Sequence, residues 1–445
     1  MNTNEPIRDA KVLGTPKMLV LGLQHMFAMF GATVLVPIIT GLSVSVTLLF
    51  AGLATLFMHL VTGKKVPVFL GSSFAFLGGY AAVVAAGETY GLTQAQSLPY
   101  ACAGVACAGL LYLVLSAVCK AYGSKNIIRF FPPVVTGPII IAIGMNLSPS
   151  AINNCETNWP IAIIAIAVVV ICNIWGKGMI KIIPILLGVV ASYVCALIFD
   201  PAARAAVAEA VSAASWIGFP IKYNETVFSL FGNCDGGLLL SSIVTIVPIA
   251  VATMMEHVGD ISAISSTVGI NFIEDPGLHR TLIGDGVGTT IAALFGAPAN
   301  TTYGENTGVL ALTKVYDPFV VRLAAFYAII LSFCPKFAAL ITAMPAATIG
   351  GVSLILYGMI SAVGIRNMVE NHTDFQKSRN VIVAALIIGL AIGINYSTDG
   401  AIAVGPVSLS GLAVASIVGI VLNAILPDKR EEDINDMNSG SLGKY

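Results

Sequence analysis

The chain has 445 residues, of which 57% are hydrophobic and only 10% are charged, and its mean hydropathy is +0.89. Average soluble domains are about 25% charged and about 45–50% apolar, so this composition excludes a soluble domain and indicates a chain embedded in lipid. Disorder is excluded too, because disordered chains are rich in charge and poor in aliphatic residues. The formal net charge of −1 leaves no basic surface for nucleic acid.

Apolar runs between polar breaks predict the membrane-spanning segments in chain order. A crossing needs about 20 residues, so the apolar material supplies up to about fourteen crossings and leaves only short loops. The expected segments are 16–36, 44–62, 66–86, 100–119, 127–147, 159–175, 181–199, 236–260, 280–297, 301–315, 317–341, 346–364, 380–396 and 408–426. The Ala-rich stretch Ala202–Ala214 contains Arg204 and Glu209, is too polar to span, and predicts a short interfacial helix.

The distribution of basic residues supports this number of segments. When loops are assigned alternately from the N-terminus, nineteen of the 22 Lys and Arg residues fall on one side. A miscounted segment would invert the side of every later loop, so the asymmetry predicts an even number of crossings with both termini in the cytoplasm. The exceptions are Arg204, Lys222 and Lys336, and Lys336 has no explanation at this level.

The two halves of the chain break at matching positions. The third segment breaks at Gly71–Phe74 after the β-like run Val66–Leu70, and the third segment of the second half breaks at Asn300–Asn306. Pro133–Thr136 and Pro345–Thr348 open the fifth segment of each half. A repeat with an odd number of crossings is inverted in the membrane, so the sequence predicts an all-α integral membrane protein of about fourteen segments in two inverted seven-segment repeats, as in secondary transporters.

Glu256 and Asp260 are ionisable residues inside the long apolar tract Gly236–Ile273. A charged side chain at mid-helix costs about 2.5–3.5 kcal/mol on insertion scales, so such residues are functional candidates. Their i, i+4 spacing places both on one helix face. The alternative is that Glu256, His257 and Asp260 mark the cytoplasmic end of the segment. The apolar residues that follow favour a buried pair of acids, which is a natural proton site.

Glu305 lies in the broken tenth segment. Non-helical backbone at membrane depth is tolerated where it lines a cavity or packs on protein, so the breaks free the N–H groups of Phe74 and Gly304 for a ligand. Glu305 and Glu256 could accept hydrogen bonds from ligand N–H groups. A planar ring with alternating N–H and C=O groups matches this array. The alternative for Gly71 and Gly304 is helix packing, for which membrane helices often use Gly.

Other polar residues in apolar segments leave alternatives open. Asp285 is expected to open segment nine beside Arg280 as a helix N-terminal acid, or else to be a further buried acid. His25, after Gln24, either lines the site or bonds between helices. Tyr357 either touches the site or belongs to an interfacial aromatic belt. The remaining histidines, interpreted as interfacial or loop residues, are His59, His279 and His372.

The cysteines show no metal or redox spacing, and most lie in apolar runs where they are expected to pack as small hydrophobic residues. Cys155 and Cys234 fall in polar loops and could form a disulfide if both faced an oxidising side. No metal-binding motif, nucleophile elbow or phosphate loop is present, because Gly284-Asp285-Gly286 lacks a preceding strand. The sequence therefore gives no indication of an enzyme.

Several of these residues lie in motifs that resemble those of the nucleobase/ascorbate transporter family, also called the nucleobase–cation symporter family. The motifs are Gln24-His25, Gly71-Ser72-Ser73-Phe74-Ala75-Phe76, Glu256-His257-Val258-Gly259, and Asn300-Thr301-Thr302-Tyr303-Gly304-Glu305-Asn306-Thr307-Gly308 followed by Thr313-Lys314. The resemblance extends from about Leu19 to about Asn423. Glu305, together with Gly350-Gly351-Val352-Ser353 and Tyr357-Gly358, is most similar to the bacterial uracil permeases in this family.

The resemblance implies a core domain, a gate domain, a short antiparallel strand in each of segments three and ten, and a homodimer formed through the gate. The implied core is 1–126 (segments one to four) and 236–343 (eight to eleven), the implied gate is 127–235 (five to seven) and 344–427 (twelve to fourteen), and 428–445 is a cytoplasmic tail. In the family, residues at the positions of Glu256 and Glu305 hydrogen-bond the pyrimidine, and amides at the positions of Phe74 and Gly304 complete the site. Further residues expected to line this site are His25, Ser73, Tyr303 and Tyr357.

One position departs from the family pattern. Uracil permeases usually carry His one turn after the first Glu, at a position linked to proton coupling, where this chain has Asp260. An Asp there resembles the purine and xanthine branch, which however tends to carry Gln at the position of Glu305. Two carboxylates one turn apart repel each other, so we expect the Glu256/Asp260 pair to hold a proton in the loaded state.

The predicted function is therefore proton-coupled import of uracil across a bacterial cytoplasmic (inner) membrane. The alternative is a proton symporter of xanthine or uric acid. A remoter alternative is an anion exchanger or channel of the same architecture, against which the three acids and the lack of buried Lys or Arg at the broken segments argue. The expected partners are uracil, the lipid bilayer and a second copy of the chain. No cofactor is expected, and H⁺ is the expected coupling ion, with Na⁺ left open.

Overall fold

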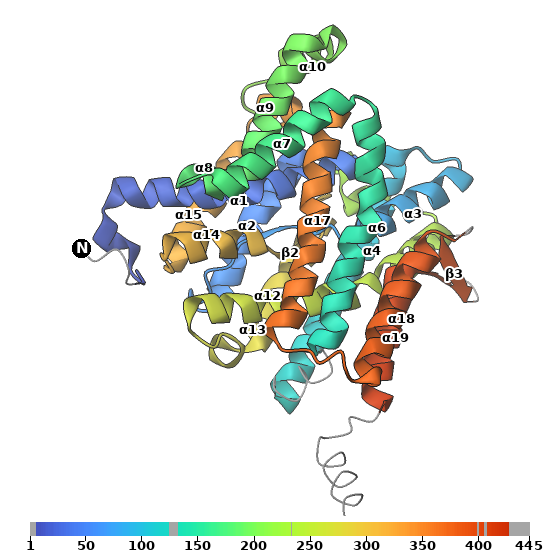
Figure 1. Cartoon of the computed structure of the whole chain (residues 1–445). Coiled ribbons are helices and arrows are strands. Elements are labelled where there is room, and N and C mark those ends of the chain that lie inside the picture. Colours follow the sequence, from blue (N-terminus) through green and yellow to red (C-terminus); the bar gives the residue numbers. More distant parts are fainter. Residues whose placement is uncertain (1–5, 124–131, 233, 398–399, 405–406, 427–445) are drawn as a thin grey trace, which may run out of the picture.

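The computed structural model describes residues 6–123, 132–232, 234–397, 400–404 and 407–426 (Figure 1). The elements of the first half are η1 (Ala10–Leu13), α1 (Thr15–Thr40), α2 (Val44–Val61), β1 (Leu70–Ser72), α3 (Leu77–Thr89), α4 (Gln94–Tyr122), α6 (Pro133–Glu156), α7 (Trp159–Trp175), α8 (Met179–Ile182), α9 (Pro184–Phe199) and α10 (Pro201–Ala213). The start of the segment expected at 127–147 and the tail expected at 428–445 lie outside the described residues.

The second half begins with two short turns, η2 (Tyr223–Glu225) and η3 (Val227–Leu230). Its further elements are α11 (Gly236–Ile246), α12 (Ile249–Val268), η4 (Ile273–Gly277), α13 (Leu278–Leu294), β2 (Asn300–Thr302), α14 (Gly304–Thr313), α15 (Pro318–Ser332), α16 (Pro335–Thr342), α17 (Ala346–Glu370), α18 (Ser378–Asn395), β3 (Ala401–Val404), β4 (Val407–Ser410) and α19 (Gly411–Ile425). In both halves, two helical segments precede a strand that leads into a short helix.

Local sequence explains where many helices begin. Pro160, Pro184 and Pro318 occupy the first turns of α7, α9 and α15, where a proline ring fits and its missing N–H costs no helical hydrogen bond. Ser43 precedes α2, and its side chain accepts a hydrogen bond from the Val46 N–H. These signals fix helix starts without any tertiary contact.

The helices confirm a multi-pass membrane protein. Within the described residues, seven helices are long and apolar enough to cross a membrane, or nine if each of two bent pairs counts as one span. The bent pairs are α9 with α10, at 109°, and α15 with α16, at 90°. The bend after α9 confirms a separate helix where Ala202–Ala214 was expected, and Figure 1 shows α10 projecting at the top of the molecule.

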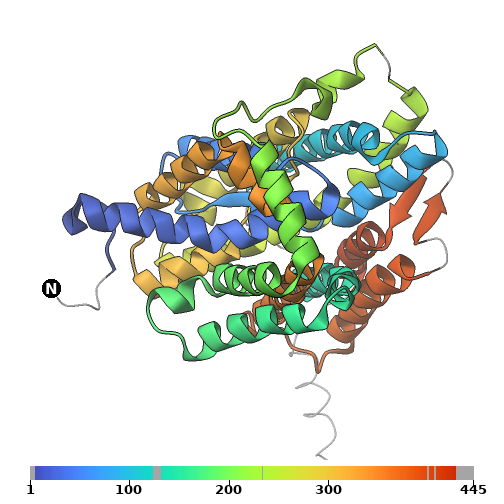
Figure 2. The same cartoon turned by 90° about the horizontal axis from the view of Figure 1, so that it is seen from above.

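Two groups of helices account for most of the packing. In one group, α17 lies along α6, with α7, α18 and α19 beside them. An added Cβ at Gly364 of α17 would lie 2.6 Å from the Gly137 carbonyl oxygen of α6, so the close approach requires glycine. In the other group, α13 packs on α2 and α4, and α15 packs on α1 and α2. Seen from above, α18, α19 and the β3–β4 hairpin occupy one edge (Figure 2).

Three features of the fold differ from the sequence-based expectations. The antiparallel β3–β4 hairpin was not predicted, and it replaces the start of the helical segment expected at 408. His59 is not interfacial, because it is 1% exposed and its Nε2 lies 2.8 Å from the Val68 carbonyl oxygen. Cys155 and Cys234 do not pair, since Cys155 is buried near the end of α6 and both are free thiols.

Candidate functional site

The two broken segments meet inside the helix bundle. β1 pairs with β2 in antiparallel register, with Gly71 opposite Thr301, which confirms the strands expected in segments three and ten. Two more backbone hydrogen bonds extend the pairing, from the Ser73 N–H to the Ala299 oxygen at 2.8 Å and from the Tyr303 N–H to the Phe69 oxygen at 3.1 Å. The strands therefore hold the starts of α3 and α14 in fixed positions near each other, at the break in each segment.

Backbone donors are available at both breaks. Gly304 is the first residue of α14, where a helix has no internal acceptor for its N–H groups and carries a partial positive charge. Phe74 lies between β1 and α3, and no hydrogen bond from its N–H to another described residue occurs in the structure. Gly304 is exposed, and a Cβ added there would meet no atom within 4 Å, so space for a ligand lies beside it.

Gly71 behaves differently from Gly304. A Cβ at Gly71 would lie 2.5 Å from the Tyr303 ring and 2.8 Å from the Thr33 hydroxyl. Gly71 is therefore a packing glycine that lets Tyr303 cross β1, as one of the two sequence-based interpretations had it. Tyr303 is 4% exposed, and its hydroxyl donates to the Ser72 carbonyl oxygen at 2.9 Å. Its side chain thus fastens one broken segment to the other.

The acids of α12 lie well inside the helix. α12 continues to Val268, so Glu256, His257 and Asp260 lie inside a helix and not at its end. Glu256 and Asp260 are both half-buried, and the Asp260 Oδ2 accepts a hydrogen bond from the Thr302 hydroxyl at 2.6 Å. Since α12 packs against β2 and α14, its acids lie close enough to Glu305 for the charges to interact.

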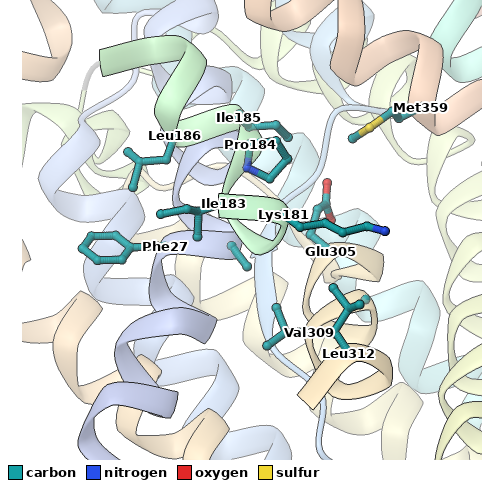
Figure 3. Close-up of a pocket in the computed structure, with 12 residues that line it drawn as sticks. Phe27, Lys181, Ile183, Pro184, Ile185, Leu186, Glu305, Val309, Leu312 and Met359 are labelled. Carbon is teal, nitrogen blue, oxygen red and sulfur yellow. The ribbon is translucent and has the colours of Figure 1, made fainter. Parts of the chain in front are cut away.

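Glu305 lines a cavity of about 150 Å³ (Figure 3). The other walls come from Phe27 of α1, Pro184 of α9 and Met359 of α17, so the cavity lies between the two groups of helices. Of the predicted substrate-binding residues, Glu305 is the one that lines it. Lys181 of α8 also borders the cavity, and this exposed cation was not singled out from the sequence.

Tyr357 and Phe74 form an aromatic contact across the two groups of helices. Their ring centroids are 5.7 Å apart and the rings meet edge to face at 76°. Tyr357 is 1% exposed, so it packs beside the broken third segment and does not belong to an interfacial belt. Edge-to-face contacts of this kind are favourable and orient both rings. The contact joins α17 to the segment that carries the Phe74 amide.

His25 bonds between helices, which is one of the two roles expected for it. The Asn306 side-chain amide donates to the His25 carbonyl oxygen at 3.0 Å, and its nitrogen lies 3.1 Å from the His25 Nδ1. His25 is fully buried, and its Nε2 has no hydrogen-bond partner among the described residues. The fully buried Ser73 hydroxyl is also unpartnered within the described part of the chain. Asn306, in the motif beside Glu305, was not predicted as a site residue.

Asp285 is not a helix N-terminal acid, in contrast to the preferred sequence-based interpretation. It lies in the middle of α13, is fully buried, and its Oδ2 is 2.9 Å from the Nδ1 of the fully buried His257. The His257 Nε2 lies 3.0 Å from the Thr281 hydroxyl, which itself donates to the Leu278 carbonyl oxygen. Both ring nitrogens thus lie close to oxygen atoms.

The site combines groups that can bind a polar ligand. Within the residues that the structure describes, no group of three or more His, Cys, Asp or Glu side chains is arranged to hold a metal ion. The two broken elements bring free backbone donors and acids together inside a bundle of apolar helices. This arrangement defines a membrane transporter.

A family model described as a permease family (Xan_ur_permease) matches residues 16–400. The chain belongs to this family of permeases and is a transporter, not an enzyme. It is 37% identical over 438 residues to the uracil permease of Bacillus caldolyticus, covering 96% of each chain. It is 36% identical over 416 residues to the uracil permease of Escherichia coli (strain K12), covering 91% of this chain and 90% of that one.

Solved structures of other transporters share the fold. The transmembrane domain of the cyanobacterial bicarbonate transporter BicA gives a TM-score of 0.59 at 13% identity, over 94% of this chain and 99% of that one. SLC26A9 gives a TM-score of 0.60 at 12% identity, over 92% of this chain and 64% of that one. At such low identity the likeness establishes the fold alone, and it agrees with a helical membrane protein whose segments are broken.

Proposed function

We propose that the protein imports uracil across a bacterial cytoplasmic membrane in symport with protons. The observation that carries this proposal is the start of α14, where a Cβ added at Gly304 would meet no atom within 4 Å and the next residue, Glu305, lines a cavity. Uracil offers N–H groups to carboxylates and C=O groups to backbone donors. The several relatives named uracil permeases, at 36% to 37% identity, support this substrate.

Proton coupling is supported by the unbalanced acids around the site. Glu256, Asp260, Asp285 and Glu305 interact electrostatically, and His257 is the buried base among them. Buried like charges favour uptake of a proton, and a proton that binds together with uracil would stabilise the loaded state. Release of the proton to the cytoplasm would then weaken uracil binding, so that the gradient drives import.

The proposed architecture has fourteen segments in two inverted repeats. Besides nine spans, reached when each bent pair counts as one, it counts α7, α13 and α19 and the two broken segments β1–α3 and β2–α14. The antiparallel pairing of β1 with β2 supports the inversion. The distribution of Lys and Arg supports cytoplasmic termini.

The two packed groups of helices support a division into two domains, in which a core of segments one to four and eight to eleven moves against a gate of the remaining segments. α6, α7 and α17 to α19 supply most of the gate, and the helices around α13 supply most of the core. The cavity at Glu305 lies between the two groups. We further propose that two copies associate through the gate.

Uptake of labelled uracil into proteoliposomes tests the proposal. An inward proton gradient should drive accumulation, and a protonophore should abolish it. Glu305→Ala removes the side-chain acceptor and should abolish binding, whereas the control Glu209→Ala, at an exposed site on α10, should bind uracil normally. Normal uptake by Glu305→Ala would disprove this site.

A second candidate is import of xanthine or uric acid, which Asp260 favours. Excess unlabelled xanthine distinguishes the two in the same assay. Uracil uptake that ignores xanthine supports the proposed substrate. Strong competition by xanthine, or no uptake of uracil, supports the purine carrier.

A further inference from the structure

Asp260 has a hydrogen-bond partner that is far away in sequence. Its Oδ2 lies 2.6 Å from the hydroxyl of Thr302, which is 42 residues further along the chain and 2% exposed. Asp260 belongs to α12, and Thr302 is the last residue of β2. The short distance is typical of a hydroxyl that donates to a charged carboxylate. The bond therefore joins the acid that departs from the uracil-permease pattern to the strand that precedes the ligand-binding residues.

The strand β2 is held on several sides, and Asp260 supplies one of these attachments. Thr302 pairs with Leu70 of β1, and the Thr289 hydroxyl contacts the backbone N–H and oxygen of Asn300 at 3.1 and 3.2 Å. Tyr303 alone separates Thr302 from Gly304 and Glu305. A displacement of the Thr302 backbone is thus transmitted within three residues to the amide and carboxylate proposed to hold uracil.

The direction of this hydrogen bond depends on a proton. A carboxylate only accepts hydrogen bonds, so the Thr302 hydroxyl must donate to the charged form of Asp260. A protonated Asp260 carries its own O–H, which competes for the same position and removes the charge that makes the bond strong. Protonation therefore weakens or reverses the attachment of β2 to α12.

Other charged groups face Asp260 and enter any dependence on pH. Glu256 lies on the same helix, Glu305 on α14, Asp285 on α13 and Arg366 on α17. None of these groups donates the 2.6 Å hydrogen bond, which comes from Thr302. A substitution of Thr302 thus changes one neutral donor and leaves every one of these charges in place.

We propose that Thr302 is a positioning residue, which couples the protonation of Asp260 to the placement of Gly304 and Glu305 through strand β2. The inference rests on the proposed function, in which protons and uracil bind together. Thr302 needs no contact with uracil for this role. Its hydroxyl sets how readily the proton binds and makes the substrate site respond to it.

The experiment measures uracil affinity of the purified full-length protein by calorimetric titration between about pH 5 and pH 9. Thr302→Val keeps the shape of the side chain and removes its donor, and Thr302→Ser restores the donor. The matched control is Thr301→Val, since Thr301 is 3% exposed on the same strand and its hydroxyl is unpartnered within the described residues. Size-exclusion profiles and melting temperatures verify that each variant folds.

We expect Thr302→Val to bind uracil and to shift the midpoint of its affinity-against-pH curve upward by about one unit, a tenfold change in proton affinity, because the carboxylate has lost a donor. Thr302→Ser and Thr301→Val should keep the wild-type midpoint. The inference is overturned if Thr302→Val and Thr301→Val have the same midpoint, whether that midpoint is the wild-type value or a shifted one.

A double-mutant cycle gives an independent test if Thr302→Val folds poorly. In the Asp260→Asn background, where the titrating carboxyl is absent, replacing Thr302 by Ser or Ala should leave the remaining pH profile unchanged. In the otherwise wild-type protein, Thr302→Ala should shift the pH profile. A shift of the same size in both backgrounds overturns the link. If the wild type binds no uracil at any pH, the proposed function itself is overturned. If the protein binds uracil but the midpoints do not change, only the inference about Thr302 is overturned.

Discussion

The buried contact between Asp285 and His257 should contribute strongly to stability. Both side chains are fully buried, and the Oδ2 and Nδ1 atoms are 2.9 Å apart. Asp285→Ala removes the carboxylate and leaves the buried imidazole without the partner at its Nδ1. Removing one partner of a buried acid–base pair costs about 3–5 kcal/mol. Asp285→Asn, which keeps an oxygen acceptor and loses the charge, should cost less.

The structure offers a matched control in the pair formed by Asp275 and Lys65. Their atoms are 2.6 Å apart, but the side chains are 69% and 51% exposed. Exposed ion pairs contribute only about 0–1 kcal/mol, so Asp275→Ala should change the free energy of unfolding little. The two substitutions delete the same chemical group, and they differ in whether water can replace the lost partner.

The melting temperature in detergent, followed by intrinsic fluorescence or a thiol-reactive dye, measures the difference. With about 2.1 cal/mol/K of unfolding entropy per residue, a chain of 445 residues should lose about 1 °C per kcal/mol. We therefore expect Asp285→Ala to melt about 3–5 °C below the wild type and Asp275→Ala to melt within about 1 °C of it. Equal melting temperatures for the two variants would refute the argument that burial makes the His257 contact strong.

Three further substitutions test the site. Asn306→Ala removes both contacts to His25 and should weaken the packing of α14 on α1. We therefore expect a lower melting temperature and reduced uracil uptake, and unchanged values would contradict this role. Glu256→Gln keeps the size of the side chain and removes an ionisable group, so the affinity for uracil should depend less on pH, and an unaltered pH profile would place the coupling proton elsewhere. Phe74→Ala keeps the amide and loses the ring contact with Tyr357, so binding should weaken by about tenfold without being abolished, as calorimetric titration can check.

The broken segments were predictable because their signals are local. The run Val66–Leu70 has β-like residues inside apolar sequence, and the polar residues Asn300–Asn306 interrupt a second apolar run. Lipid offers no hydrogen bonds to an interrupted helix, so such breaks must find partners inside the protein. The structure supplies these partners by pairing β1 with β2. The register of the pairing was not predictable, since it joins residues about 230 positions apart.

Asp285 shows how a reasonable local interpretation fails. Its distance from Arg280 and the nearby glycines suggested a helix start, but α13 begins earlier, at Leu278. Hydropathy has no means of showing that His257 faces Asp285 from the neighbouring helix. His59 was misjudged for the same reason, because its acceptor is a carbonyl oxygen in the chain that leads to β1.

The sequence by itself determined the class of the protein, most of its helical segments and its two breaks. These properties follow from hydropathy, from the cost of burying charge and from helix start signals, all of which act over about twenty residues or fewer. Tertiary structure alone decided which polar groups meet, including the contact of Asp260 with Thr302 and that of Asp285 with His257. Each buried polar group needs a partner, but in a bundle of helices the partner is set by packing between distant segments and not by distance along the chain.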